Sequence, residues 1–283
     1  MWNSRLNEKL TNRLIGYCQN KRVLILGNSV SLLNEPRGDF IDSFDVVVRL
    51  GKGIPFPELK DYLGQKTDVW ALSVLRADLY KYFVDTPYKV LNIAQISVYD
   101  TKKKTTSISK VFYNNDFELY KDYFLMGDLT GTRRLIKSAY GKVDQNERVS
   151  QGAMTLAYFV NIIKSYKELH IYGFDFFEGK ITYELDGEVN EVSSFHLPIP
   201  VHKGTNSNPH AGLYVAGHPD KDYILKLRDE NKIILHEMSP LKDNEETKQK
   251  IQTIVDIFRK EAKLLGIETS TPIQKDGEDT PGE

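Results

Sequence analysis

The sequence is poor in cysteine, in long apolar runs and in net charge. Its single cysteine, Cys18, excludes an internal disulfide bond and fits the reducing environment of a cytoplasm. No apolar run is long enough to span a membrane, and the first ten residues lack the pattern of a signal peptide. The net charge of −1 gives no overall sign of nucleic-acid binding, although a local basic patch is compatible with it. These absences predict a cytoplasmic protein.

The composition and the order of the apolar segments indicate an α/β protein. With 283 residues, of which 40% are hydrophobic, the chain can bury a sizeable core. Short apolar runs alternate with helical patterns, which argues for a parallel sheet. We therefore expect one Rossmann-like domain over residues 1–266, with a central, mainly parallel sheet flanked by helices. Residues 267–283 are expected to form a disordered tail.

One apolar run ends in a turn that could hold a ligand. The run 23–26 stops abruptly at Gly27, Asn28 and Ser29, which is typical of a strand buried on both faces of a parallel sheet. Gly27 would let the backbone approach a ligand, and Asn28 and Ser29 offer hydrogen-bonding groups beside a helix N-terminus. An ordinary strand, turn and helix without a ligand explains the same pattern, because a single glycine turn is a weak signal.

Two further strands also end in polar groups. One ends in the cation Arg49, and the other, over residues 169–172, is followed by Gly173 and Asp175. A helix capped by Ser150 precedes the second of these strands. We expect all three strands in one parallel sheet, where their carboxyl ends meet at one edge and outline a site for a phosphate-bearing small molecule.

The segment with the first two strands resembles the large sialylmotif of sialyltransferases, glycosyltransferase family 29. The order GNSxxL, then FIDSFDVVVR, then LGQKTDVWAL is similar to that motif. The resemblance implies a sialyltransferase-like fold and a nucleotide-sugar donor. The residues that fall where the motif expects them are Gly27, Asn28, Ser29, Leu32, Gly38, Ile41, Asp42, Asp45, Arg49, Gly64, Lys66 and Thr67.

The segment from Arg148 to Phe177 is similar to the small sialylmotif and to the matching stretch of the bacterial sialyltransferases of family 42. Those bacterial enzymes place two tyrosines against the leaving phosphate, and this chain has Phe177 and Tyr183 at the two positions. Phenylalanine has no hydroxyl to donate to a phosphate oxygen, whereas tyrosine does. The resemblance therefore implies that Tyr183 contacts the donor. A surface tyrosine in a hairpin over residues 181–189 is the alternative.

Four of the six histidines fall between His196 and His218, but their spacing fits no standard zinc site. We expect no metal and no cofactor beyond the nucleotide sugar. In both sialyltransferase families a histidine just before a helix near the C-terminus deprotonates the acceptor hydroxyl, and His218 lies at that place. A helix-capping surface residue is the alternative for His218. His210 and Tyr214 fall near the family's His-Tyr pair, with a different spacing.

Two positions depart from the sialyltransferase motifs. Gly51 stands where an asparagine usually contacts the nucleotide, and Gln151, just before Gly152, stands where serine or threonine contacts the sialic-acid carboxylate. The resemblance thus implies inverting sugar transfer with either CMP-sialic acid or a UDP-sugar as the donor. A UDP leaving group carries more charge and would need extra cations. The candidates are Arg49, Lys52 and Arg148.

The sequence leaves the acceptor open. A glycan is the usual acceptor in these families. The alternative is hydroxymethylated cytosine in DNA, glycosylated inside a phage-infected bacterial cell, for example with UDP-arabinose. The basic clusters at 102–104 and 133–137 favour DNA, although solvated surface explains them equally well. A third alternative is a non-catalytic nucleotide-binding module, against which the retained His218 argues. Nothing in the sequence indicates the oligomeric state.

Overall fold

The computed structural model describes residues 4–72, 81–83, 85–91, 99–100, 105–106, 124–126, 150–176, 178–185, 188–192 and 220–264. The elements, in chain order, are α1 (Ser4–Cys18), β1 (Arg22–Leu26), η1 (Val30–Asn34), α2 (Gly38–Asp42), β2 (Val46–Leu50), η2 (Pro57–Leu59), α3 (Lys60–Leu63), β3 (Val69–Leu72), η3 (Lys81–Phe83), β4 (Tyr88–Leu91), β5 (Tyr99–Asp100), β6 (Thr105–Thr106), β7 (Phe124–Met126), α8 (Gln151–Tyr158), η5 (Phe159–Ile163), β8 (Glu168–Tyr172), β9 (Ile181–Leu185), β10 (Glu188–Val192), α9 (Asp220–Asp229), β11 (Ile234–Leu235) and α10 (Glu245–Leu264).

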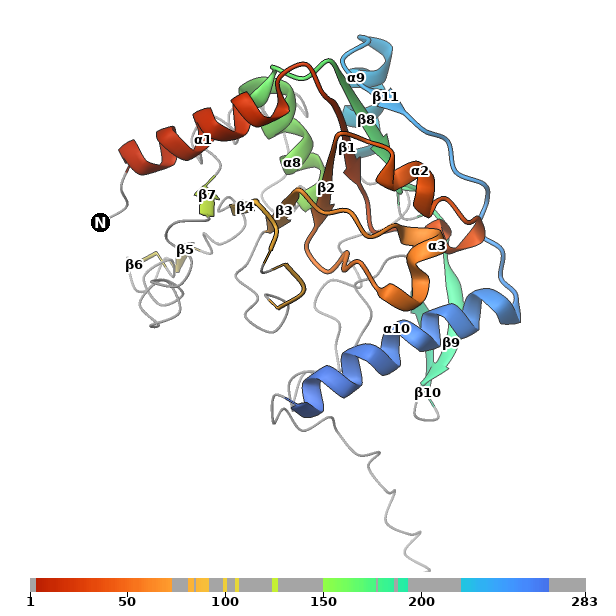
Figure 1. Cartoon of the computed structure of the whole chain (residues 1–283). Coiled ribbons are helices and arrows are strands. Elements are labelled where there is room, and N and C mark those ends of the chain that lie inside the picture. The colour runs from red at the N-terminus through yellow and green to blue at the C-terminus, as the bar shows by residue number, and fades with distance from the viewer. Residues whose placement is uncertain are drawn as a thin grey trace, which may run out of the picture.

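A seven-stranded sheet forms the centre of the molecule, in the order β11-β8-β1-β2-β3-β4-β7 (Figure 1). Every neighbouring pair of strands in it is parallel. All carboxyl ends therefore lie at one edge of the sheet, called here the carboxyl edge, and all amino ends at the opposite, amino edge. The expected Rossmann-like α/β fold with a parallel sheet is confirmed.

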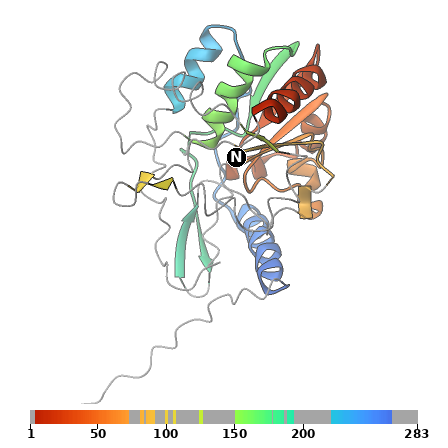
Figure 2. The same cartoon turned by 90° about the vertical axis from the view of Figure 1, so that its left-hand side faces the viewer.

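The sheet is covered on both faces, because the side chains of each strand point alternately to either side. In β1, Leu24 and Leu26 are buried against η1, α2, α3 and α10, while Val23 and Ile25 are buried against α1, α8 and α9. Figures 1 and 2 show these two groups of helices on either side of the sheet. The expectation that the run 23–26 is a strand buried on both faces is confirmed. Among the described helices, none is both long and apolar enough to span a membrane.

The hairpin of β9 and β10 and the helix α10 extend together from the carboxyl edge (Figure 2). The predicted hairpin is therefore present. The chain before α10 is held to η1, because Asn34 Nδ2 donates to the carbonyls of Ser239 and Pro240 at 3.0 and 2.8 Å. Lys250 in α10 adds a bond from Nζ to the Leu33 carbonyl at 3.0 Å. The C-terminal helix is thus part of the domain.

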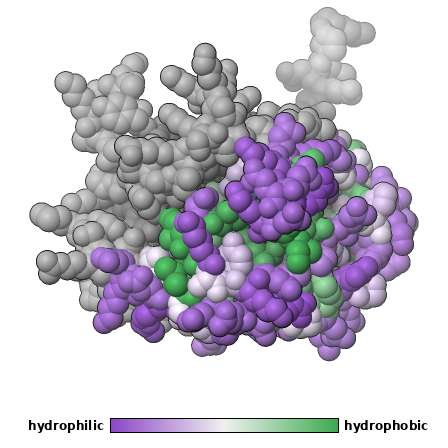
Figure 3. Space-filling view, turned by 90° about the horizontal axis from the view of Figure 1, so that it is seen from above, coloured by the Kyte–Doolittle hydropathy of each residue, from purple (hydrophilic) through white to green (hydrophobic). Residues whose placement is uncertain are grey.

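The amino edge carries a shallow groove between η5, β8 and β11. Its apolar floor includes Val160, Leu169 and Ile233, and Lys164 and Lys232 also line it. Figure 3 views the molecule from this end, where hydrophobic residues are surrounded by hydrophilic ones. Because the strand-end residues singled out from the sequence lie at the opposite edge, this groove is separate from the candidate site.

Two histidines connect the outermost strand to the sheet. His170 in β8 and His236 after β11 are stacked, with the His170 Nδ1 and His236 Nε2 atoms 2.9 Å apart. His170 Nε2 donates a hydrogen bond to the Glu168 carboxylate at 3.1 Å, so Nδ1 of the neutral His170 ring accepts one from His236 Nε2. Burial lowers the pKa of both rings, and the charges of Arg22 and Arg37 lower that of His236 further.

This pair predicts that the protein loses stability in mild acid. The unfolded chain takes up protons near the ordinary histidine pKa of about 6.5, whereas the folded chain resists protonation to lower pH. The free energy of unfolding should therefore fall as pH drops from about 7.5 to about 5.5. Urea denaturation at several pH values in this range measures the free energy of unfolding. That free energy should depend less on pH in the double variant His170→Gln/His236→Gln than in the wild type. An equal pH dependence in both proteins would show that this histidine pair does not cause the loss of stability in acid.

Candidate functional site

The order of the strands identifies one end of the sheet as the place for a ligand. Along the chain the strands move outward from β1 through β2, β3, β4 and β7, and then return to the other side of β1 with β8 and β11. The carboxyl ends of β1 and β8 form this switch point, where ligands of open parallel sheets bind. The expectation that the strands ending near Gly27, Arg49 and Gly173 share one parallel sheet is confirmed.

At the switch point the two turns touch each other. Gly27 N donates to the Tyr172 carbonyl at 2.7 Å, and Ser29 N donates to the Gly173 carbonyl at 3.2 Å. A Cβ atom on Gly27 would lie 2.1 Å from the Gly173 oxygen, and Gly173 itself has φ +80°. Gly27 therefore makes room for the backbone of the neighbouring turn, and its expected contact with a ligand stays a prediction.

Phe174 packs between the two segments that resemble sialylmotifs, and the sequence interpretation missed it. A Cβ atom on Gly27 would lie 2.8 Å from its ring, and a Cβ atom on Gly152 would lie 2.5 Å from it. The ring thus fits between one glycine of each segment. Gly152, expected at the nucleotide, makes room for this ring in the first turn of α8. The sequence signal for this packing was the pair Gly27 and Gly152 together with an aromatic residue after β8. The same combination also fits a ligand site.

Ser29 and Asp175 meet across the switch point. The Ser29 hydroxyl donates to Asp175 Oδ2 at 2.5 Å, and the Ser31 hydroxyl donates to the same oxygen at 3.1 Å. Ser29 Oγ also accepts the Ser31 N–H at 3.0 Å, and so caps η1, a 3-10 helix of five residues. Two residues expected at the donor are therefore bonded to each other in this structure.

Asn28 differs from its neighbours because half of its side chain has no partner. Its Nδ2 donates to the Leu50 carbonyl at 2.9 Å, which fixes the amide between the ends of β1 and β2. Its Oδ1 is buried and has no hydrogen-bond partner among the described residues. An unsatisfied buried acceptor costs about 1–3 kcal/mol, so a donor from a ligand would stabilise this position.

Three hydrogen bonds to backbone carbonyls connect the end of β2, β3 and the start of α8. Gly51, with φ +48°, donates its N–H to the Ala71 carbonyl at 2.8 Å and accepts from Trp70 Nε1 at 2.8 Å. Gln151 Nε2 donates to the same Ala71 carbonyl. Gly51 and Gln151 were expected at the donor, and in this structure they connect β2, β3 and α8. Lys52 is partly buried in the same turn.

Arg49 is a structural cation. Its side chain is only 1% exposed, and its guanidinium donates to the carbonyls of Leu63 and Lys66 at 2.7 and 3.0 Å and to Thr67 Oγ1 at 2.9 Å. Burial lowers its pKa to about 10. The expectation that Arg49 meets a ligand phosphate does not fit this burial, because all of these bonds hold the segment that leads into β3.

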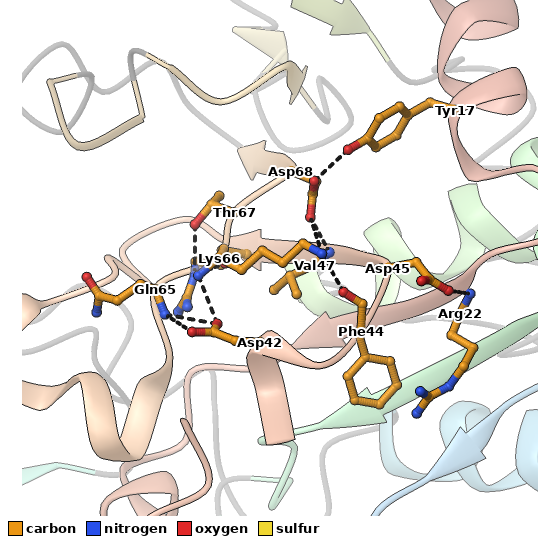
Figure 4. Close-up of polar contacts among 11 residues, drawn as sticks. Tyr17, Arg22, Asp42, Phe44, Asp45, Val47, Gln65, Lys66, Thr67 and Asp68 are labelled. Atoms are coloured by element: carbon orange, nitrogen blue, oxygen red, sulfur yellow. Dashed lines mark hydrogen bonds and ion pairs between the residues drawn. The ribbon is translucent and has the colours of Figure 1, made fainter. Parts of the chain in front are cut away.

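The rest of the large-motif segment supports the amino edge. Asp42 accepts from the N–H groups of Gln65 and Lys66, and the Lys66 ammonium donates to the Phe44 carbonyl (Figure 4). Asp45 accepts the Arg22 N–H at 2.8 Å. These residues precede the strands, whereas residues 27–29 follow one. The segment therefore has two parts: Asp42, Asp45 and Lys66 hold the amino edge together, and residues 27–29 lie at the carboxyl edge, beside the candidate site.

Asp68, which follows the motif residues, bonds to groups from several parts of the chain. It accepts from Tyr17 at 2.6 Å and from the Val47 N–H at 2.9 Å, and it lies 4.0 Å from Lys66 Nζ (Figure 4). Tyr17 belongs to α1, so this carboxylate also connects the N-terminal helix to β2 and β3. Burial, followed by the bond to Asp68, raises the pKa of Tyr17 well above its ordinary value.

The N-terminus of α8 lies at the carboxyl edge and meets the start of α9. Ser150 caps α8 as expected, because its Oγ accepts the Ala153 N–H at 3.1 Å. The Ser150 N–H donates to Asp220 Oδ2 at 3.2 Å. Asp220 is a second residue that the sequence interpretation missed. Its only signal was an acidic residue in the first turn of a predicted helix, which usually means no more than a favourable charge.

The remaining expected residues lie partly or wholly outside the described structure. Tyr183 lies in β9, whose position beside α10 is described, but its side chain is outside the description. Within the described residues, no three His, Cys, Asp or Glu side chains are placed to hold a metal ion. Outside the described residues lie Arg148, Phe177, His196, His202, His210, Tyr214, His218, the clusters 102–104 and 133–137, and the tail.

Comparison with known proteins gives similarity in fold only. No protein-family model and no curated protein matches the sequence. A crystal structure of a mammalian sialyltransferase is similar with a TM-score of 0.46 and 14% identity, over 84% of this chain and 81% of that one. The structure of a mammalian sialyltransferase in complex with Gal-beta-1-3GalNAc-ortho-nitrophenol is similar with a TM-score of 0.45 and 14% identity, over 83% and 80%.

Proposed function

We propose that this chain is an inverting glycosyltransferase that moves a sugar from a nucleotide-sugar donor to an acceptor hydroxyl. The observation that carries the proposal is the unpartnered, buried Oδ1 of Asn28 at the switch point of the sheet. A ribose hydroxyl is a donor that could bond to this oxygen, and Asn28 Nδ2 keeps a second hydrogen for a phosphate oxygen. Both sialylmotif-like segments meet beside Asn28, which agrees with the resemblance of the sequence.

In the proposed reaction the acceptor oxygen attacks the anomeric carbon of the donor while His218 takes its proton. A new bond forms between that carbon and the acceptor oxygen. The bond from the carbon to the phosphate oxygen breaks on the opposite face, and the nucleotide leaves with the electron pair. The leaving phosphate is held by Asn28, by the first-turn N–H groups of α8 at Gln151 and Gly152, and by Tyr183.

The assignment of His218 as the base is supported by its place in the sequence, just before α9. His218 precedes Asp220 by two residues, and two residues of extended chain span at most about 7 Å. The first residue of α9, Asp220, bonds to the residue that caps α8, which supports a base in this part of the chain. The Arg49 guanidinium makes structural bonds, and the other two candidate cations for a UDP donor are Lys52 and Arg148.

The reaction is tested by a screen for sugar transfer, read by mass spectrometry. CMP-sialic acid and several UDP-sugars, UDP-arabinose among them, are offered with glycan acceptors and with hydroxymethylated DNA. Transfer with inversion at the anomeric carbon supports the proposal and identifies the donor and acceptor. Nucleotide binding without transfer from any donor would favour the non-catalytic binding module.

The Asn28→Ala variant is expected to weaken nucleotide binding about 10- to 150-fold. A hydrogen bond to a charged group contributes about 1.5–3 kcal/mol, which corresponds to this range. Calorimetric titration with CMP and with UDP measures the loss and shows which base is preferred. The matched control is Asn161→Ala, because Asn161 Nδ2 also donates to a backbone carbonyl, that of Ala157 at 2.8 Å, but lies in η5. Equal, millimolar binding of both nucleotides in wild type and variant would contradict the assignment.

A further inference from the structure

The first turn of α9 contains a carboxylate that is buried at the candidate site. Asp220 is 4% exposed, although aspartate is almost never fully buried without a partner. Its Oδ2 accepts the Ser150 N–H at the N-terminus of α8. Asp222, in the same first turn, is exposed. The burial of Asp220 is therefore specific to its position and is not a general property of acidic residues at this helix start.

A second contact fixes the same helix end. Lys221 forms an ion pair with Glu178, and its ammonium lies 5.6 Å from the centre of the Phe176 ring. Phe176 has φ +56°, a backbone conformation that is uncommon outside glycine and is often found at functional sites. The start of α9 is thus held to α8 by Asp220 and to the turn after β8 by Lys221. Ser150 and Phe176 belong to the segment similar to the small sialylmotif, and Glu178 directly follows it.

We propose that Asp220 is a positioning residue, which holds the chain that carries His218 against the N-terminus of α8. The inference rests on the proposed function, in which His218 is the base. A carboxylate that accepts a hydrogen bond from a helix N-terminus is strongly oriented, because the bond is charge-assisted and the helix dipole favours it. In this proposal Asp220 is the fixed point from which the chain leads to the base, two residues earlier in the sequence.

The experiment compares Asp220→Ala and Asp220→Asn with the matched control Asp229→Asn. Asp229 lies on the same helix, with a side chain that is 65% exposed. A displacement of about 1 Å can cost 10²-fold in rate, so Asp220→Ala should lose kcat by about that factor, with donor affinity nearly unchanged. Asp220→Asn keeps an oxygen that can accept the Ser150 N–H and should recover most of kcat. The control should match wild type.

A double-variant cycle separates positioning from a purely structural role. If Asp220 acts through His218, the variant His218→Ala/Asp220→Ala should be no slower than His218→Ala alone, because the group that Asp220 positions is already absent. Effects that multiply, or wild-type kcat in Asp220→Ala, would overturn the inference. Full activity in His218→Ala would instead overturn the base assignment in the proposed function.

Stability is followed by thermal melting, and kinetics are measured well below the melting temperature of each variant. If Asp220→Ala does not fold, Asp220→Ser replaces it in the cycle. Serine is well tolerated at a helix start but is too short to maintain the bond to the Ser150 N–H. The same loss of kcat is expected for it, and wild-type kcat would overturn the proposal in the same way.

Discussion

His218→Ala is expected to reduce the rate of sugar transfer by about 10²–10⁴-fold, the usual contribution of a general base. Donor binding should stay almost unchanged, because the proposed base contacts the acceptor hydroxyl and not the nucleotide. The variant should therefore lose kcat while calorimetry gives a wild-type dissociation constant for the nucleotide. In the wild type, activity should fall as pH drops through the pKa of the imidazole, since the protonated ring has no lone pair to accept a proton.

The controls for this prediction are the other histidines of the same part of the chain. His196→Ala, His202→Ala and His210→Ala should retain most of the activity. His210 ranks second as a base, because it precedes the same helix in the sequence. Near-normal turnover in His218→Ala together with collapse in His210→Ala would move the base to His210. It would also remove the reason for assigning a positioning role to Asp220.

Gly27→Ala is expected to destabilise the fold more than any other single methyl group added at the described glycines of the site. The new Cβ would lie 2.1 Å from the Gly173 oxygen and 2.6 Å from its carbonyl carbon, and both are backbone atoms that can move only with β8. Overpacking of this kind costs about 1–3 kcal/mol, and occasionally more. The shift would also displace Asn28, so nucleotide affinity should fall with stability.

Two other glycine-to-alanine variants serve as references for the change in stability. Gly16→Ala in α1 meets no atom within 4 Å and should stabilise the protein by about 0.5–1 kcal/mol, because alanine is the better helix residue. The stability of Gly152→Ala should lie between those of Gly16→Ala and Gly27→Ala, since the Phe174 ring at 2.5 Å belongs to a side chain that can rotate. Urea denaturation measures all three. A Gly27→Ala variant as stable as wild type would show that β1 and β8 separate easily at the switch point.

The resemblance to sialyltransferases and the geometry of the strand ends bear on different parts of the proposal. The resemblance alone designates His218, Tyr183 and the donor class. The geometry contributes Asn28, the N-terminus of α8 and the fixed start of α9. The Asn28 variant therefore tests the inference from geometry, and the His218 variant tests the inference from resemblance. The prediction for one variant can fail while the prediction for the other is confirmed.

Much of the fold followed from local patterns in the sequence. The apolar run before Gly27 specified a strand buried on both faces, because only a strand with both sets of side chains in the core is apolar at every position. Ser150 specified the start of α8, because its hydroxyl can cap only the N–H groups that directly follow it. The placement of three strand ends at one edge followed from their parallel direction.

The partners of the strand-end residues were decided only by the tertiary structure. A ligand site and a neighbouring turn of the protein need residues of the same size with the same hydrogen-bonding groups. The residues that contact other parts of the protein here are Gly27, Ser29, Arg49 and Gln151. Their partners are distant in sequence, as Asp175 is from Ser29, and no local pattern distinguishes a protein carbonyl from a ligand oxygen. Asn28 retains an unsatisfied atom because the strands that enclose it use only its amide nitrogen.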